Sequence, residues 1–289
     1  MRFKSNAFKF IWRVITIKYL IQRQYEAAKL EKPLQAVFAN DTIGSFINVD
    51  GVFEKNQLEV LTDFLNIMNF SFNSKDCIDV GANIGNHSLY FSDLFSTVTS
   101  FEAHPKVFKL LEFNTAEFKN ITCYNKGIGE KREILRLSGN LHNTGGSSFV
   151  YDQRQTQYYD VQVENLDTYL DQFNQVGLIK IDVEGMEEAV INGALGIISR
   201  DKPVIVFEQS QEDFGNQNST PSMRILSKIG YDFFWINNDW NSSSLIKRFF
   251  RLVAGLIRGN FNIDIVIQGP GLVPVVHHDM LIAVFKSDT

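Results

Sequence analysis

The stretch IDVGANIGNHS at residues 78–88 decides the fold of this chain. It begins as a short apolar run, breaks into Gly81 and Gly85, and continues as an apolar-periodic segment. This order predicts a strand, a glycine turn and a helix, a unit whose backbone can approach a nucleotide-like ligand closely. A second apolar run ends at Glu102, 23 residues after Asp79, where a carboxylate can accept both hydroxyls of a ribose. Together the two segments predict a nucleoside-cofactor site.

The glycine spacing distinguishes between cofactors. A dinucleotide site has the pattern G-x-G-x-x-G, with a helix N-terminus directed at a pyrophosphate. Here the pattern is D-x-G-x-x-x-G, and Asp79 precedes the first glycine. A carboxylate there would repel a pyrophosphate but suits a ligand with an ammonium and a sulfonium group, so we expect S-adenosyl-L-methionine rather than NAD. A purely structural turn is the alternative. The expected cofactor-binding residues are Asp79, Gly81, Ala82, Asn83, Ile84, Gly85, His87, Glu102, Ala103, Asn125 and Asp182.

A second motif, GLIKIDVEGMEE at residues 177–188, again reads as a buried strand that ends in carboxylates and a glycine turn. At this point the chain resembles the FkbM family of S-adenosylmethionine-dependent methyltransferases. The resemblance rests on four segments in the family's order, and Ala103 stands where the family usually has proline. The segments are IDVGANIG at 78–85, FEAHP at 101–105, NLDTYL at 165–170 and KIDVEGMEE at 180–188.

The resemblance implies a class I, Rossmann-like methyltransferase whose reaction centre includes the box at 180–188. It further implies O-methylation of a hydroxyl on a sugar, a glycan or another polyhydroxylated metabolite. Two alternatives stay open: a catalytically inactive cofactor-binding module of the same fold, and a methyltransferase for a lipid-linked or other non-sugar acceptor. A dinucleotide oxidoreductase is disfavoured, because the third glycine of its motif is missing.

The residues that end the predicted strands supply the catalytic candidates. Methyl transfer to a hydroxyl needs alignment of the reactants and a base within hydrogen-bond reach. Asp182 and Glu184 are the expected catalytic carboxylates, with Lys180 as their cationic neighbour. Two other interpretations remain: Glu184 as a carboxylate that stabilises a helix N-terminus, and Asp182 with Glu184 or Glu208 as ligands of a divalent cation. No zinc-type cluster of Cys and His is present in the sequence, and we expect no metal site.

The alternation of strands and helices predicts a doubly wound α/β fold with a mostly parallel, seven-stranded sheet. The last two strands have no long helix between them, which predicts an antiparallel pair at the sheet edge. The polar segment 130–163 should form a β-hairpin excursion. Strands are expected near 76–80, 98–102, 121–125, 178–182, 203–207, 231–236 and 281–285, and helices near 87–95, 105–118, 186–198 and 220–229.

We divide the chain into an N-terminal helical extension, 1–50, and a methyltransferase domain, 51–289, with an insertion at 239–279. The overall formal charge is −5, yet residues 1–32 carry eight Lys or Arg against two Glu, a net charge of +6. Charges interrupt every apolar run there, so the segment is neither a membrane span nor a signal peptide. A helix packed on the catalytic domain is favoured over one that contacts an anionic membrane or an acidic partner.

The insertion contains a second basic and apolar segment, 245–258, with four basic residues and no acid. It could form an acceptor-binding lid, a dimerisation arm or a membrane contact, and 1–30 together with 245–258 could hold the protein at a membrane surface. Nucleic acid is not an expected partner, because no RNA- or DNA-binding module is recognisable. Cys77 and Cys123 lie in apolar contexts, which favours free thiols and a cytoplasmic location. The sequence does not indicate an oligomeric state.

Overall fold

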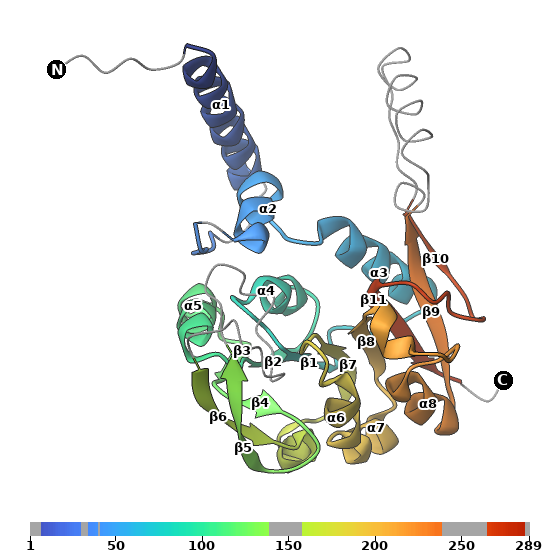
Figure 1. The fold of residues 1–289 in the computed structure, drawn as a ribbon. Coiled ribbons are helices and arrows are strands. Elements are labelled where there is room, and N and C mark those ends of the chain that lie inside the picture. The colour runs from blue at the N-terminus through green and yellow to red at the C-terminus, as the bar shows by residue number, and fades with distance from the viewer. Residues whose placement is uncertain (1–6, 30–33, 40, 139–157, 239–264, 287–289) are drawn as a thin grey trace.

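The computed structural model describes residues 7–29, 34–39, 41–138, 158–238 and 265–286 (Figure 1). Within these residues the chain forms one large mixed sheet and one small sheet. The strands of the large sheet are β1 (Asp76–Val80), β2 (Thr97–Phe101), β3 (Ile121–Tyr124), β7 (Val176–Ile181), β8 (Val204–Gln209), β9 (Tyr231–Asn238), β10 (Ile265–Gln268) and β11 (His278–Phe285). The small sheet contains β4 (Gly127–Ile128), β5 (Glu133–Ser138) and β6 (Tyr158–Glu164).

The large sheet has the order β10-β9-β11-β8-β7-β1-β2-β3. β3, β2, β1, β7 and β8 are parallel to one another, whereas β11 is antiparallel to both β8 and β9. The doubly wound α/β fold and the antiparallel pair near the C-terminus are therefore confirmed. The antiparallel pairing of β5 with β6 likewise confirms the expected hairpin.

The predicted count of seven strands is wrong for the large sheet, which has eight among the described residues. The additional strand is β10, which comes from the expected insertion and pairs antiparallel with the end of β9. Ile267 of β10 and Ile236 of β9 lie opposite each other and pack against the same apolar cluster. The short apolar run that forms β10 is therefore stabilised by pairing with β9, and the sequence pattern did not indicate this pairing.

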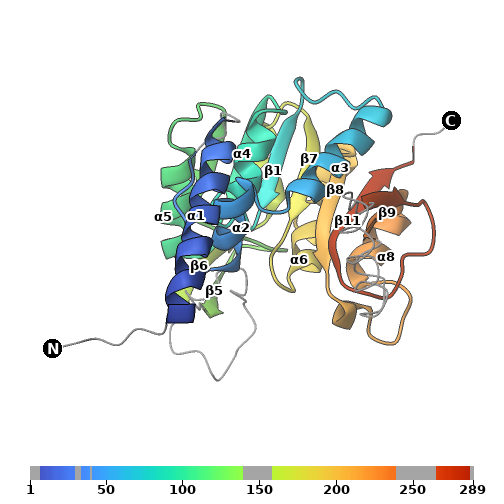
Figure 2. The ribbon, with the colours of Figure 1, turned by 90° about the horizontal axis from the view of Figure 1, so that it is seen from above.

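Helices cover both faces of the large sheet (Figures 1 and 2). α3 (Lys55–Ile67), α4 (Asn86–Ser92) and α5 (Pro105–Thr115) lie on one face, and α6 (Glu187–Asn192), α7 (Leu195–Asp201) and α8 (Pro221–Lys228) lie on the other. Each layer has its own apolar core, one around Leu58 and Leu61 of α3 and one around Ile191 and Ile197 of α6 and α7. The carboxyl ends of the parallel strands remain open between these layers.

The single helix expected over 186–198 is two helices, α6 and α7. A Cβ atom on Gly193, between them, would collide with the carbonyl oxygen of Gly129, so the two backbones approach each other closely. The carboxylate of Asp167 then accepts the N–H groups of Gly196 and Ile197 at distances of 2.8 and 2.9 Å. This carboxylate satisfies the free N–H groups at the start of α7, which stabilises a new helix start.

Two asparagines fix the N-terminal segment against the body of the protein. Asn114 of α5 accepts the N–H of Ala36 at 2.7 Å and donates to the carbonyl oxygens of Ala36 and Ile84 at 3.0 and 2.8 Å. Asn86 of α4 makes the same paired contact with the backbone of Phe53, at 2.9 and 3.0 Å. α2 (Thr42–Asp50) lies between these two attachment points and is thereby held beside the glycine turn.

The structure does not show the favoured packing of the N-terminal helix on the catalytic domain. α1 (Ala7–Lys29) extends away from the α/β body in Figure 1, and Ile11 and Ile15 are 55% and 53% exposed. Its contact is with α2, where Arg23 donates to the carbonyl oxygen of Val49 at 3.2 Å and pairs with Asp50 at 3.1 Å. No described helix is long and apolar enough to cross a membrane. The segment 245–258 lies outside the described residues.

Candidate functional site

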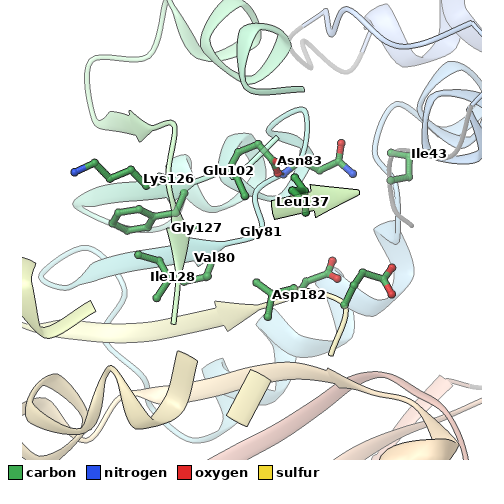
Figure 3. A pocket seen from close by; sticks show the side chains of 14 residues that line it. Ile43, Val80, Gly81, Asn83, Glu102, Lys126, Gly127, Ile128, Leu137 and Asp182 are labelled. Atoms are coloured by element: carbon green, nitrogen blue, oxygen red, sulfur yellow. The ribbon is translucent and has the colours of Figure 1, made fainter. Parts of the chain in front are cut away.

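A pocket opens at the carboxyl ends of β1, β2 and β7, where the fold leaves strand ends uncovered (Figure 3). Five of the expected cofactor-binding residues line it: Gly81, Asn83, Glu102, Ala103 and Asp182. The catalytic candidate Glu184 also lines it. The other lining residues are Ile43, Val80, Phe101, Lys126, Gly127, Ile128, Leu137 and Val183. The pocket therefore contains both glycine turns, the one after β1 and the one after β7.

Gly81 lies at the floor of the pocket, and no residue with a side chain fits its position. Its φ is +78°, in the left-handed region, and a Cβ atom there would lie far inside contact distance of the carbonyl oxygen of Asp182. The N–H groups of Gly81 and Ala82 both donate to the carbonyl oxygen of Phe101 at 2.9 Å. The ends of β1, β2 and β7 are thus joined at one point, with room for a ligand directly above.

Glu102 is almost fully buried in the wall of this pocket. Its two carboxylate oxygens accept the N–H groups of Asn83 at 2.9 Å and His104 at 2.7 Å, which fixes their direction. Burial raises the pKa of Glu102 to about 7, although the two backbone donors favour the ionised form. Each oxygen keeps a second lone pair for a ligand hydroxyl. A carboxylate fixed in this way suits the two hydroxyls of a ribose.

Asn83 supplies a second sign that the pocket fits a polar ligand. Its side-chain oxygen is buried and makes no hydrogen bond with any described residue. Buried polar atoms are nearly always paired, so an unpaired one beside Glu102 points to a missing donor. An amino group or a hydroxyl of the cofactor could supply that donor. Together with the glycine floor and the ribose carboxylate, this atom fits an adenosine-containing cofactor.

Most of the remaining lining residues are apolar, and they were not predicted. Ile128 lies at one side and Ile43 of α2 at the opposite side (Figure 3). Leu137 of the small sheet and Phe101 also line the pocket. Such side chains suit the flat ring system of a nucleobase. The alternating apolar residues of β5 were a weak signal for Leu137. Nothing in the sequence pattern of residues 41–50 indicated Ile43.

Asp79 does not line the pocket, contrary to its predicted contact with the cofactor. Its side chain is fully buried, accepts a hydrogen bond from Ser88 at 2.6 Å and pairs with the Lys180 ammonium at 3.2 Å. Lys180 also donates to the carbonyl oxygen of Gly81 at 2.9 Å and lies 3.4 Å from Asp182. Burial favours the neutral amine, but the two aspartates outweigh it and raise the pKa of Lys180. Asp79 and Lys180 therefore hold the glycine turn and Asp182 in position without lining the pocket themselves.

The other expected cofactor residues support the pocket without lining it. His87 is buried and pairs with Glu54 at 3.2 Å, and Ile84 packs in an apolar cluster. Asn125 donates to the carbonyl oxygens of Glu102 and Ala103 at 2.8 and 3.2 Å. Ala82 is buried, and Gly85, with φ +96°, precedes the first residue of α4. The expected cofactor-binding residues therefore divide into a set that lines the pocket and a set that supports it.

Carboxylates gather at the end of the pocket formed by β7 and β8. Burial opposes the ionisation of Asp182, but the Lys180 ammonium and a hydrogen bond from Glu208 hold its pKa below the usual value. Burial and the charge of Asp182 raise the pKa of Glu208 to about 9, so the proton between them resides on Glu208. Partial burial, with Asp182 and Glu187 nearby, raises the pKa of Glu184 to about 7. Glu184 is the group of this cluster that changes charge near neutral pH.

The backbone places Glu184 at the mouth of the pocket. Glu184 and Gly185 have φ values of +48° and +92°, so two successive left-handed residues reverse the chain after β7. Such a conformation is rare for a glutamate and recurs at functional sites. Glu187 instead accepts the N–H of Gly185 at 3.0 Å and stabilises the start of α6. Among the described residues, no group of three or more His, Cys, Asp or Glu is arranged to hold a metal ion.

A mostly parallel sheet in which the antiparallel strand β11 lies between β8 and β9 is the arrangement of a class I, Rossmann-like methyltransferase. The model of the family described as "Methyltransferase FkbM domain" matches residues 79–233, more than half of the chain. The chain belongs to the FkbM methyltransferase family, whose members use S-adenosylmethionine. The resemblance inferred from the four sequence segments is confirmed.

Solved structures give weaker likenesses. A methyltransferase FkbM from Methylobacillus flagellatus is 23% identical, with a TM-score of 0.34, over 47% of this chain and 32% of that one. The chain thus matches about a third of that protein's length. An O-methyltransferase from Bacillus cereus in complex with SAH is 12% identical over 93% and 91% of the two chains, with a TM-score of 0.41. A precorrin-6y C5,15-methyltransferase from Geobacter metallireducens is 14% identical over 79% and 88%, with a TM-score of 0.40. No curated protein matches the chain.

Replacing Glu102 with glutamine should weaken S-adenosylmethionine binding by about 10- to 100-fold, because hydrogen bonds to a charged acceptor contribute about 1.5–3 kcal/mol. Calorimetry with the cofactor and with its demethylated product measures the effect. Glu112→Gln, which changes an exposed glutamate on α5, is the matched control and should bind normally. Unchanged affinity in Glu102→Gln would mean that this carboxylate does not contact the ribose.

Proposed function

We propose that the protein transfers the methyl group of S-adenosylmethionine to a hydroxyl of a sugar, a glycan or a related polyhydroxylated metabolite. The observation that carries this proposal is the position of Glu184: a carboxylate at the mouth of the cofactor pocket whose pKa is raised to about 7. A group with that pKa is unprotonated often enough at neutral pH to accept a proton, and basic enough to do so.

The two catalytic carboxylates, Glu184 and Asp182, have different roles. S-adenosylmethionine, when bound, supplies an electrophilic methyl group. Glu184 accepts the hydroxyl proton of the acceptor as the new bond to oxygen forms. Asp182 is a weaker base, because the Lys180 ammonium and the Glu208 proton stabilise its charge. Its role is to orient the reactants with a fixed negative charge, while Lys180 holds it in place from the far side of the turn.

A second cavity supports the choice of a polyhydroxylated acceptor. It has a volume of about 530 Å³ and lies where β9, β10 and the segment before β11 meet. The ring of Trp235 and the amides of Asn237, Gln268 and Gln57 contribute to its lining. An aromatic face and several amides together are suited to the C–H face and the hydroxyls of a sugar.

The second cavity adjoins the carboxylate cluster. His277 lines this cavity, and its Nε2 atom lies 3.5 Å from a carboxylate oxygen of Glu208, which in turn bonds to Asp182. His277 also contacts Asp279 at 2.9 Å. His277 and Glu208 thus link the lining of this cavity to Asp182 of the cofactor pocket. Residues 139–157 of the expected hairpin excursion lie outside the described residues.

The test is to incubate the protein with isotopically labelled S-adenosylmethionine and a panel of sugars, glycans and lipid-linked glycans, and to follow the label by mass spectrometry. Methyl ethers survive mild alkali whereas methyl esters do not, so alkali treatment identifies a hydroxyl acceptor. Label in an alkali-stable sugar product supports the proposal. Label only in alkali-labile or nitrogen-linked products would refute it, and cofactor binding without any transfer would favour the inactive module.

A further inference from the structure

The N-terminal helix α1 carries apolar side chains that the rest of the described structure leaves exposed. Besides Ile11 and Ile15, Ile21 is 58% exposed and Val14 is 36% exposed. Soluble proteins rarely leave a contiguous apolar surface of this kind uncovered unless it binds something. The aromatic residues Trp12 and Tyr19 of the same helix are also exposed.

The attachment of α1 to α2 turns this surface outward. At helical spacing, Ile11, Val14, Ile15 and Ile21 share one face of α1. Arg23, which bonds to the end of α2, lies largely on the opposite face. The contact that holds α1 to α2 therefore leaves the isoleucine-rich face exposed.

The charge of the helix identifies the chemistry of its partner. From residue 7 to residue 25, α1 contains Lys9, Arg13, Lys18 and Arg23 and no acid, whereas the chain as a whole has a charge of −5. We propose that α1 docks on an anionic lipid surface, with its isoleucine face in the acyl boundary and its basic residues at the headgroups. Trp12 and Tyr19 are residue types that favour this boundary.

Lys18 favours a lipid surface over a second copy of the chain. It lies in the middle of the isoleucine face and at the midpoint of Ala7–Lys29. A two-fold pairing of copies in parallel, or antiparallel about the middle of this face, would place two Lys18 ammonium groups together, which is unfavourable. At a membrane the same side chain can bury its methylene groups and keep the ammonium among the phosphates. The proposed contact of α1 with a lipid surface does not depend on which acceptor is methylated.

The test compares the binding of the full chain to vesicles of phosphatidylglycerol and of phosphatidylcholine by flotation. The protein should bind the anionic vesicles preferentially, and binding should fall as salt rises, because exposed charges are screened over about 10 Å at 0.1 M. Lys18→Gln should weaken binding about fivefold, the factor expected for one basic residue near such a surface. Ile11→Asn/Ile15→Asn should weaken it at least about tenfold.

A matched control separates the effect of α1 from a general loss of apolar surface. Ile67→Asn/Ile134→Asn replaces two isoleucines that are 81% and 70% exposed elsewhere, and it should bind vesicles as the unchanged chain does. Failure of the unchanged chain to bind, or normal binding by the α1 double variant, would overturn the proposal. So would a dimer in sedimentation velocity that Ile11→Asn/Ile15→Asn converts to monomer, since the face would then be an interface between copies.

Discussion

The substitution Gly81→Ala should lower the free energy of unfolding by about 3 kcal/mol or more and remove detectable cofactor binding. Alanine at φ +78° is strained, and its methyl group would collide with the backbone carbonyl of Asp182. Backbone atoms cannot move aside as the end of a flexible side chain could. Relief requires that β1 and β7 separate at the floor of the pocket. Urea denaturation measures the stability, and calorimetry measures the cofactor affinity.

Gly215→Ala is the matched control for this prediction. Gly215 also has a positive φ, +53°, but nothing lies within 4 Å of the place its Cβ would take. It should therefore show only the cost of its own positive-φ backbone conformation, with normal cofactor binding. If Gly81→Ala proves no more harmful than Gly215→Ala, the strand ends can part easily and the close approach has no importance for the site.

The substitution Glu184→Gln should lower kcat by about 100-fold or more, the scale of general-base catalysis, while the protein stays folded and binds cofactor. In the unchanged enzyme the rate should rise with pH through about 7, because Glu184 accepts a proton only in its ionised form. Glutamine cannot ionise, so this rise should disappear from the profile of the variant. Steady-state rates between pH 5.5 and 8.5 test both points.

Glu188→Gln is the control for Glu184→Gln, since it changes an exposed glutamate four residues further along the same box. It should leave both kcat and the pH profile unchanged. Full activity in Glu184→Gln would show that the box is structural and that the base lies elsewhere. A rise near pH 7 that persists in an impaired variant would assign the titration to another group, such as Glu102, whose pKa is also raised to about 7.

Local patterns made most of the fold predictable. The strand after residue 176 and the strand before Gly81 are short buried runs followed by glycine turns, and both occur where expected. Glu102 was identified for the same reason, because strand-end carboxylates in parallel sheets meet at one edge. These features depend only on a few residues that are neighbours in the sequence, so a short stretch of sequence is enough to predict them.

The parts that were not predicted depend on contacts between distant segments. Asp79 and Asp182 look alike in sequence, since each ends a buried strand before a glycine turn. Only the fold shows that Asp79 faces inward to Ser88 and Lys180, whereas Asp182 reaches the pocket. The apolar lining from Ile43 is of the same kind, because an isoleucine on a short helix carries no sign of what lies opposite it.

The paired backbone contacts of Asn114 and Asn86 set the size of the smallest active fragment. The family segment begins at residue 79, yet Ile43 closes one side of the pocket and is held there by residues 36 to 53. A truncated chain that starts at residue 51 would retain every motif of the family but would lack Ile43. The side of the pocket that Ile43 closes would then be open to water. Expression of the recognisable domain in isolation should thus yield a folded protein with impaired cofactor binding, and the first useful boundary lies before residue 34.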